Sequence, residues 1–425
     1  MVVVQKFGGS SLATPEHIRR VAARICRERA VGRQLVVVVS AMGHTTDDLL
    51  QALLTLNPQA PAREVDMLLA TGEQAATALL ASALWGMDCP AVSLTGWQAG
   101  VSTDGVHRKA QIATVDPARV RRECAAGRVV IVAGFQGLSP DGEITTLGRG
   151  GSDTTAVALA AALGATTCEI YSDVDGVYTA DPRVVAEARR IPAISYDEMM
   201  EMAHLGAQVL HIRAVECALI HGVTIVARST FTDGPGTRIT EVEPLEDRSL
   251  ARAVAHDRNV AKVALCGVPD RPGVAYRLFA ALSQRHINVD MIIQSQSRDG
   301  KNDIAFTVAS DELVHAQESA QAAAADLGAE AVLAADGYAK VSLVGAGMAS
   351  NPGVAAAMFA ALADAGVNID MISTSEIKIS CLVRREHVDK AVRAVHTAFA
   401  LAEGPVEGSL PRTPTVAATR LRAGP

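Results

Sequence analysis

Residues 2–11 read VVVQKFGGSS, and this stretch gives the first indication of the fold. A short β-branched strand runs into two consecutive glycines, and a helical pattern begins nearby at Thr14-Pro15-Glu16. Consecutive glycines let backbone N–H groups approach an anion closely, and a helix N-terminus adds a favourable dipole. Lys6, at the end of the strand, supplies a point charge suited to phosphate oxygens. Gly-Gly alone also fits an ordinary strand–helix turn.

Beyond this turn, short strand patterns alternate with longer helical patterns through the first half of the chain. Strands are expected at residues 2–5, 35–40, 91–94, 129–133, 169–171 and 223–226. Helices are expected at residues 15–28, 64–84, 117–126, 152–163 and 195–221, the last broken near Gly206. This alternation predicts a largely parallel sheet covered on both faces, in which ligands bind beyond the carboxyl ends of the strands.

Two further polar loops follow expected strands. Residues 145–154 read TTLGRGGSDT and open a helix, and their glycines are costly unless the backbone must approach a ligand closely. Arg149 offers a planar fork for a carboxylate or phosphate, whereas Ser152 or Asp153 could simply cap the helix. Residues 171–183 read YSDVDGVYTADPR, with hydroxyls and carboxylates that suit nucleotide or Mg²⁺ binding. Neither Gly8-Gly9 nor the glycine-rich stretch 145–154 is a Walker loop, because no Gly-Lys-[Ser/Thr] follows the glycines.

The second half contains an internal repeat. Residues 272–292 read PGVAYRLFAALSQRHINVDMI and residues 352–372 read PGVAAAMFAALADAGVNIDMI, identical at 12 of 21 positions. Each copy continues a strand–helix–strand–strand–helix pattern. Two copies are too few for a solenoid, so we expect a pair of small α/β modules.

Composition narrows the class of protein. The chain is 49% hydrophobic and 20% charged, as in globular proteins, and its net charge of −7 with 3% aromatic residues argues against nucleic-acid binding. No run of about 18 uninterrupted apolar residues and no signal-peptide pattern occurs, so we expect no membrane span. The seven cysteines form no C-x-x-C pair, so we expect reduced, mostly buried thiols in the cytoplasm.

Together these motifs resemble the aspartokinases of the amino acid kinase superfamily. The resemblance is carried by residues 6–11 (KFGGSS), 40–47 (SAMGHTTD), 71–74 (TGEQ), 145–153 (TTLGRGGSD) and 171–183, and by the repeat, which resembles two ACT modules. It covers nearly the whole chain, and no motif departs from the family pattern. It implies an α/β amino acid kinase fold, with a mostly parallel central sheet between helices, followed by two ferredoxin-like βαββαβ ACT modules. The implied bounds are residues 1–228 for the catalytic domain, 229–259 for a linker, 260–335 and 336–405 for the modules, and 406–425 for a tail.

The resemblance also implies the reaction. ATP, with Mg²⁺, would phosphorylate L-aspartate to 4-phospho-L-aspartate, the first step toward lysine, threonine, methionine and diaminopimelate. The attacking carboxylate is already a nucleophile near neutral pH, which agrees with the lack of a histidine or cysteine constellation. Two alternatives stay open: an inert amino-acid sensor, or another amino acid kinase. Loss of Lys6 or Arg149 would favour the sensor, and both are present.

The resemblance assigns roles residue by residue. Lys6 and Asp153 would be catalytic, with Asp153 orienting Lys6 or the metal. Arg149 would bind the aspartate α-carboxylate and Glu73 its ammonium group, although a lone glutamate on a helix is usually solvated. ATP would be bound by Lys6, Phe7, Gly8, Gly9, Ser40, Ser172, Asp173, Tyr178, Asp181 and Arg183, and aspartate by Thr46, Glu73, Arg149, Gly150, Gly151 and Ser152. No metal ligand is assigned.

The same resemblance implies regulation through the ACT modules. Lysine and threonine would be the inhibitors, bound by Asp270, Gly273, Asn288, Asp290, Gln294, Asn368 and Asp370. The implied assembly is a homo-oligomer, or a hetero-oligomer with an ACT-only subunit. No methionine lies between Met202 and Met291, so such a subunit would need a non-AUG start, for example at Val242. A start at Met291 would discard the first strand and helix of the first module.

Overall fold

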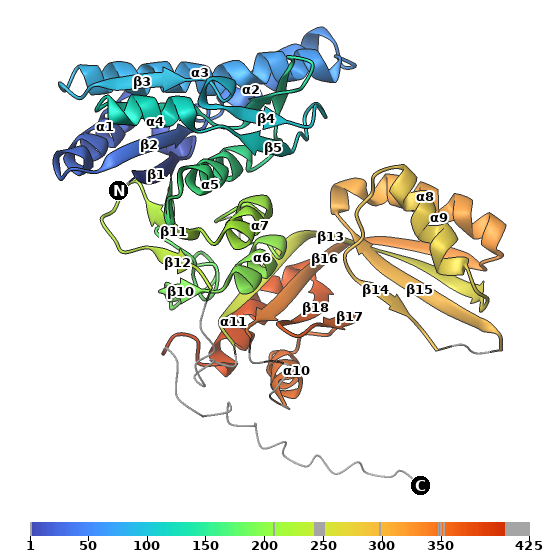
Figure 1. Ribbon diagram of the computed structural model, residues 1–425. Helices are drawn as coiled ribbons and strands as arrows, with labels where there is room; N and C mark the ends of the chain where they lie inside the picture. The colour runs from blue at the N-terminus through green and yellow to red at the C-terminus, as the bar shows by residue number, and fades with distance from the viewer. Residues whose placement is uncertain are drawn as a thin grey trace. The chain divides into compact units, whose positions relative to one another are not determined.

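The protein, described here by a computed structural model, folds into two compact units (Figure 1). The structure describes residues 2–206, 209–241, 251–296, 299–346, 348, 351 and 353–403. The N-terminal unit comprises residues 1–177 and 190–243, and the C-terminal unit comprises residues 178–189 and 244–425. The expected tail at residues 406–425 and the proposed start at Val242 lie outside the described residues.

An eight-stranded sheet forms the centre of the N-terminal unit, in the order β10-β12-β11-β9-β1-β2-β6-β3. All neighbouring strands are parallel except β11 and β12. The strands are β1 (Val2–Phe7), β2 (Gln34–Val39), β3 (Ala91–Leu94), β6 (Val129–Ala133), β9 (Thr167–Ser172), β10 (Ala193–Ile194), β11 (Thr224–Ser229) and β12 (Thr237–Ile239). The six expected strands are therefore confirmed. β10 and β12 were missed because strands of two or three residues carry no readable alternation.

Helices cover the sheet as the alternation predicts. Phe7 and Tyr171 belong to a core that α1 (Pro15–Ala30) and α3 (Ala62–Trp85) form with the sheet, whereas Lys6 contacts Asp153 of α5 (Gly151–Leu163). Because neighbouring strand residues face opposite sides, α5 lies on the other face (Figure 1). The remaining helices are α2 (Thr45–Leu56), α4 (Ala118–Ala125), α6 (Tyr196–His204) and α7 (Ile212–His221), with 3₁₀ turns at Ser10–Leu12 and Trp97–Ala99. α2 was not expected, and its inward stripe at Leu49, Leu50 and Leu53 is only half-buried, with none of its residues fully buried.

A small second sheet, also not predicted, packs against α3. Its order is β5-β4-β7-β8, made of β4 (Val101–Thr103), β5 (Ile112–Val115), β7 (Gln136–Leu138) and β8 (Ile144–Thr146). Gln136 of β7 donates its side-chain N–H to the carbonyl of Ala70 on α3 (2.8 Å). These strands of three or four residues place the loops that flank them against one face of α3.

α3 is long and apolar enough, by length and composition, to cross a membrane, and no other helix among the described residues passes that test. Half (50%) of the most apolar 18-residue stretch of α3 is buried inside the unit. Leu80 and Leu84 pack in the core with α1 and the sheet, as expected for the core helix of a globular unit.

The C-terminal unit is one antiparallel six-stranded sheet, in the order β14-β15-β13-β16-β18-β17. Its strands are β13 (Ala253–Pro269), β14 (Ile292–Gln294), β15 (Lys301–Val308), β16 (Ala331–Val344), β17 (Met371–Thr374) and β18 (Lys378–Arg384). β13 and β16 are longer than expected and pair with each other through both modules, with register shifts between Asp257 and Lys262. The first part of β13, expected in the linker, is therefore a strand of the sheet.

Two hydrophobic cores lie between this sheet and its helices, one for each repeat. α8 (Val274–Gln284) and α9 (Leu313–Leu327) cover the half with β15, and α10 (Val354–Asp364) and α11 (Val388–Ala398) cover the half with β18 (Figure 1). 3₁₀ turns at Ser310–Glu312 and Arg385–His387 precede α9 and α11. Ala251 and Val254 belong to the second core. The second module thus takes its first strand from residues that precede the first module.

Residues 178–189, which follow the YSDVDGV sequence, pack in this second core, and we call them the arm. Ala180 and Val185 are buried there beside residues of α10 and α11. Thr179 accepts the N–H of Arg189 at its hydroxyl (2.9 Å), and the same hydroxyl lies 2.9 Å from Nε2 of the buried His396. The backbone carbonyl of Thr179 accepts the N–H of Val254 (2.8 Å). The arm is thus packed and hydrogen-bonded as part of the C-terminal unit.

Candidate active site

The loops that follow β1, β2 and β9 meet at one edge of the parallel sheet. Gly8 donates its N–H to the carbonyl of Tyr171 (3.1 Å), and Gly43 donates to the carbonyl of Gly9 (3.0 Å). A Cβ on Gly9 would lie 2.8 Å from the carbonyl oxygen of Ala41, so the close approach of these loops requires glycine there. The edge is where an open parallel sheet binds its ligands.

Lys6 and Asp153 form the charged centre of this edge. Lys6 Nζ lies 2.7 Å from Asp153 Oδ1, and both side chains are nearly buried. The N-terminus of α5 has no side-chain cap within the described chain, so the alternative that Ser152 or Asp153 caps this helix is wrong. A Cβ on Gly8 would lie 3.4 Å from Lys6 Nζ. The Gly8 N–H is already bonded to the carbonyl of Tyr171, whereas the ammonium of Lys6 is a cation at this edge that could meet a phosphate.

Glu73 lies in the buried stripe of α3 and faces the same edge. Its Oε1 accepts the N–H of Ala41 (3.0 Å), while its buried Oε2 has no hydrogen-bond partner among the described residues. Burial raises the pKa of Glu73 to about 7, and Lys6 and the Ala41 N–H act in the opposite direction. An unpartnered, buried carboxylate oxygen is a group that a cationic ligand could satisfy.

Arg149 extends from the loop before α5. Its side chain is exposed and makes no hydrogen bond or ion pair within the described part of the chain. Gly148 and Gly150 on either side have φ angles of 76° and 69°, which explains the glycine-rich sequence. Thr46, in the first turn of α2, is half-buried, and Ser152 is buried at the start of α5, where its side chain lies against Gly134.

Besides Lys6, Gly8 and Gly9, the seven other residues assigned to ATP divide into three groups. Phe7 is fully buried and stacks on Tyr171 with ring centroids 4.8 Å apart, so its side chain cannot contact a ligand at the sheet edge. Ser40 follows β2, Ser172 is the last residue of β9 and Asp173 follows it, so all three lie at that edge.

Tyr178, Asp181 and Arg183 belong to the arm of the C-terminal unit. Asp181 accepts hydrogen bonds from Arg183, which lower the pKa of this carboxyl. These three residues are therefore not part of the unit that carries Lys6.

No group of three or more histidine, cysteine, aspartate or glutamate side chains that could hold a metal occurs among the described residues. Mg²⁺ in nucleotide sites is usually held by one or two carboxylates together with phosphate oxygens and water. Asp153 is the carboxylate that lies beside Lys6, so the residues present fit a Mg²⁺ ion that arrives with the nucleotide.

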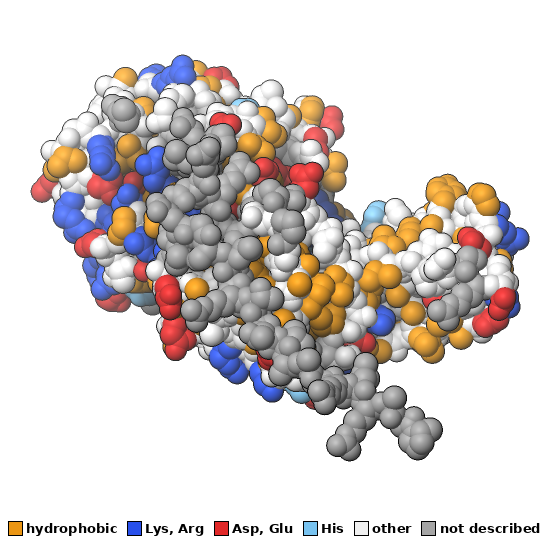
Figure 2. Space-filling model, turned by 90° about the horizontal axis from the view of Figure 1, so that it is seen from below, with side chains coloured by type: hydrophobic (Ala, Val, Ile, Leu, Met, Phe, Trp, Pro, Cys, Tyr) orange, Lys and Arg blue, Asp and Glu red, His pale blue; other side chains and the backbone are white. Residues whose placement is uncertain are grey.

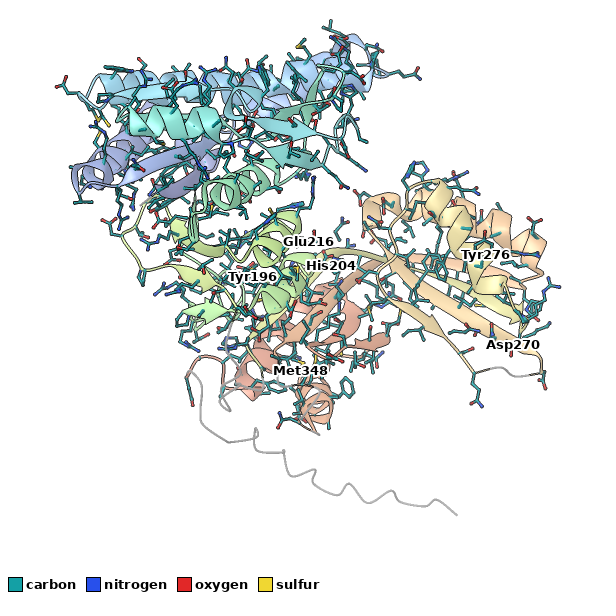
Figure 3. All side chains as sticks on the ribbon, viewed as in Figure 1. Tyr196, His204, Glu216, Asp270, Tyr276 and Met348 are labelled. Carbon is teal, nitrogen blue, oxygen red and sulfur yellow. The ribbon has the colours of Figure 1, made fainter. Side chains whose placement is uncertain are left out.

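The residues assigned to effector binding do not form one cluster within the chain. Asp270 lies beside Gly300 and Asn302 at the start of β15, and Figure 3 places it at the end of β13. Asp290 donates its N–H to Thr307, near the other end of β15, about 20 Å away by the strand rise. Gln294 lies between them on β14, and Gly273, with φ of 92°, is the N-cap residue of α8.

The aspartates of the two Asn-x-Asp-Met-Ile sequences each pair with a lysine of the other module. Asp290 pairs with the buried Lys340, and Asp370 lies 3.8 Å from Lys262. Lys262 and Lys340 occupy matching places in the first strands of the two repeats. Asn288 and Asn368, two residues before these aspartates, are exposed. Both aspartates therefore connect the two modules in this conformation.

Two residues at this edge were missed by the sequence analysis. His211 packs against Gly150, since a Cβ there would lie 2.1 Å from its ring, and burial lowers its pKa. Asp66 is fully buried on α3, seven residues before Glu73. The signal for Asp66 was present, because an acidic residue in an apolar helix, two turns from another, occupies the same face.

Comparison with known proteins finds relatives that cover 94% of the chain. Residues 1–227 match the amino acid kinase family, and residues 262–324 and 341–399 each match the ACT domain. The chain is 52% identical to the aspartokinase of Mycolicibacterium smegmatis over 406 residues, covering 94% of this chain and 96% of that protein. It is 50% identical to the aspartokinase of Thermus thermophilus over 402 residues, covering 94% and 99%.

Solved structures of an aspartokinase are also similar to this chain. Escherichia coli aspartokinase III in complex with aspartate and ADP (R-state) is similar with a TM-score of 0.74 at 26% identity, covering 93% of this chain and 99% of that chain. The same enzyme in complex with lysine and aspartate (T-state) gives a TM-score of 0.72 at 27% identity, over the same coverage.

Proposed function

This chain belongs to the amino acid kinase family as an aspartokinase with two ACT domains, and from that premise we propose how its residues carry out and regulate the reaction. The substrates are MgATP and L-aspartate, and the product is 4-phospho-L-aspartate. The observation that carries this proposal is the Lys6–Asp153 pair at 2.7 Å, at the sheet edge that Glu73 and Arg149 also border. That arrangement offers a cation for the transferred phosphoryl group and separate charges for the two ends of an amino acid.

Phosphoryl transfer depends on positioning and on neutralisation of charge more than on covalent help. Lys6 neutralises the developing charge on the phosphoryl oxygens, and Asp153 holds its ammonium in place. Arg149 binds the α-carboxylate through its planar fork, and Glu73 accepts the α-ammonium at Oε2. The β-carboxylate of aspartate is left to attack, and it needs no general base.

Arg149→Lys tests the substrate side of this proposal. Lysine keeps the charge but loses the bidentate fork, so the KM for aspartate should rise by about tenfold or more while the KM for ATP stays close to wild type. Glu64→Gln, a change to an exposed glutamate of α3 that pairs with Arg63, is the control. A variant that loses ATP affinity instead would place Arg149 on the phosphate side.

Regulation is the second part of the proposal. Lysine and threonine bind the C-terminal unit near the Asp270–Gly273 loop and inhibit catalysis. β14 and β17 are the two edges of its sheet, with Ile292 and Ile372 exposed at 52% and 40%. Apolar side chains are visible at the surface of this unit in Figure 2. An unpaired edge with exposed apolar residues favours pairing with another ACT module, so the chain assembles as an oligomer or with an ACT-only subunit.

The arm supplies a covalent route from the regulatory unit to the nucleotide loop. It begins five residues after Asp173 in the chain, and its core contacts lie with α11 and β13. We propose that a change in the C-terminal unit reaches the nucleotide side of the reaction through this segment.

A further inference from the structure

We propose that Asp66 is a positioning residue for aspartate binding, because it holds the two backbone segments that border Arg149. The inference rests on the proposed role of Arg149 as the ligand of the substrate α-carboxylate. Asp66 itself touches no substrate group in this account. It acts through the loop of residues 104–111 and through residues 146–148.

The contacts of Asp66 account for both of its carboxylate oxygens. Oδ1 accepts the hydroxyl of Thr146 (2.5 Å) and the N–H of Arg108 (3.1 Å). Oδ2 accepts the same N–H (3.0 Å) and lies 2.8 Å from Nδ1 of His107. A carboxylate offers about four acceptor positions, and here donors from two segments fill them. Asp66 is fully buried, so water does not compete for these bonds.

These bonds join the two segments into one piece. Ala110 donates its N–H to the carbonyl of Thr146 (3.0 Å), directly beside the Asp66 contact. Arg213 donates to the carbonyls of Leu147 and Ala110 from α7. A Cβ on Gly148 would lie 3.0 Å from the carbonyl oxygen of Arg108, so the segments are in close backbone contact.

Arg149 depends on this support because its own side chain has no partner in the described chain. Its position is therefore set by the backbone of residues 146–148, which Asp66 holds through Thr146. A shift of about 1 Å in a substrate-binding group is enough to lower catalytic efficiency by about a hundredfold.

α3 relates this support to Glu73. Asp66 and Glu73 are seven residues apart on one buried stripe, about 10 Å along the helix axis. Glu73 holds the loop after β2 through Ala41, and Asp66 holds the loop before α5. One rigid helix thereby sets the distance between the ligand for the ammonium group and the ligand for the carboxylate.

The test uses a matched pair at Thr146 together with Asp66→Asn. Thr146→Val removes the hydroxyl that Asp66 accepts, and Thr146→Ser keeps it. We expect Thr146→Val and Asp66→Asn to raise the KM for aspartate by about tenfold or more with the KM for ATP unchanged, and Thr146→Ser to stay close to wild type. Glu64→Gln, on the same helix, is the control for loss of an exposed acid.

A second readout does not depend on activity. Arg108 and Lys109 are exposed, so trypsin should cleave there faster in Thr146→Val and Asp66→Asn than in Thr146→Ser. If Asp66→Asn does not fold, the Thr146 pair decides the question. A folded Thr146→Val enzyme with wild-type aspartate KM, or one whose ATP KM rises equally, would overturn the inference.

Arg149→Lys separates the two proposals. If Arg149→Lys raises the aspartate KM and the Thr146 and Asp66 variants do not, only the role of Asp66 fails. If Arg149→Lys leaves the aspartate KM unchanged, the proposed role of Arg149 fails, and the role of Asp66 fails with it.

Discussion

Burial distinguishes side chains that look equivalent along the sequence. Lys6 and Phe7 are neighbours in one motif, yet Lys6 contacts Asp153 on one face of the sheet while Phe7 stacks on Tyr171 in the core of the other. The alternation of β1 decides this, and it could have been used to exclude the Phe7 side chain from the ATP site. Glu73 is the opposite case, because a lone glutamate on a helix is usually solvated, and only its seven-residue spacing from Asp66 in an apolar helix indicated a buried face.

The raised pKa of Glu73 predicts a pH dependence of substrate binding. In the free enzyme the carboxyl has a pKa of about 7, so acidification through this value neutralises the group that accepts the ammonium. We expect kcat/KM for aspartate to fall as the pH is lowered from 8 to 6 (about tenfold per unit at the acid end), while kcat/KM for ATP changes less.

Glu73→Gln provides the control for that prediction. The variant should have a high KM for aspartate at every pH, and its profile should lose the step near neutrality. Glutamine also removes a costly buried charge, so the variant should melt at a higher temperature than wild type above pH 7. In wild type the native carboxyl keeps its proton up to about pH 7, whereas the unfolded one keeps it only to about pH 4.5. The stability of the native state therefore declines as the pH rises from about 4.5 to about 7. A pH profile identical to wild type would exclude Glu73 as the titrating group.

Elements with a clear period were predictable, and those without one were not. The repeat located α8 and α10, and the β-branched runs located the core strands of the parallel sheet. The small sheet beside α3 has strands of three or four residues, too short for a pattern, and α2 buries no residue. β13 was expected to be shorter because Asp257-Arg258-Asn259 interrupts its alternation, and the structure accommodates this interruption with register shifts.

The arm could not be predicted from local sequence, because its partners come from the end of the chain. Thr179→Val removes the hydroxyl that lies between the part-buried Arg189 N–H and the buried His396, and it leaves both groups without that partner. We expect a loss of about 1–3 kcal/mol of stability, and weaker inhibition by effectors with near-normal turnover in their absence. Thr179→Ser, which keeps the hydroxyl, should behave like wild type. Inhibition curves that coincide for the valine and serine variants would exclude the arm as the regulatory connection.

In the molecule as a whole, regulation requires the C-terminal unit to respond to the binding of an effector. Asp270→Ala should leave turnover intact and weaken inhibition by threonine, alone or together with lysine, by several-fold, because coupling between sites is typically about 1–3 kcal/mol. Asp299→Ala, at another exposed aspartate of this unit, is the control. Wild-type enzyme that ignores every mixture of the two amino acids would reject the regulatory proposal and leave the kinase assignment intact.

The intertwined modules bear on the proposed ACT-only subunit. Because β13 is a central strand of the six-stranded sheet, a product starting at Met291 would lack the strand that both cores need. A companion fragment should therefore begin before Ala253. Mass spectrometry of the purified protein would show this, and a stable fragment beginning at Met291 would contradict it.

The proposed reaction is phosphoryl transfer from ATP to the side-chain carboxylate of aspartate, with Lys6 at the transferred group. The most direct measurement traps the acyl phosphate with hydroxylamine in the presence of MgATP, for wild type and for Lys6→Ala. We predict aspartyl hydroxamate with aspartate, none with glutamate, and a loss of at least about a hundredfold in Lys6→Ala with its fold unchanged. Hydroxamate formed equally from glutamate would reject aspartate as the specific substrate, and near-normal turnover in Lys6→Ala would reject the role of Lys6.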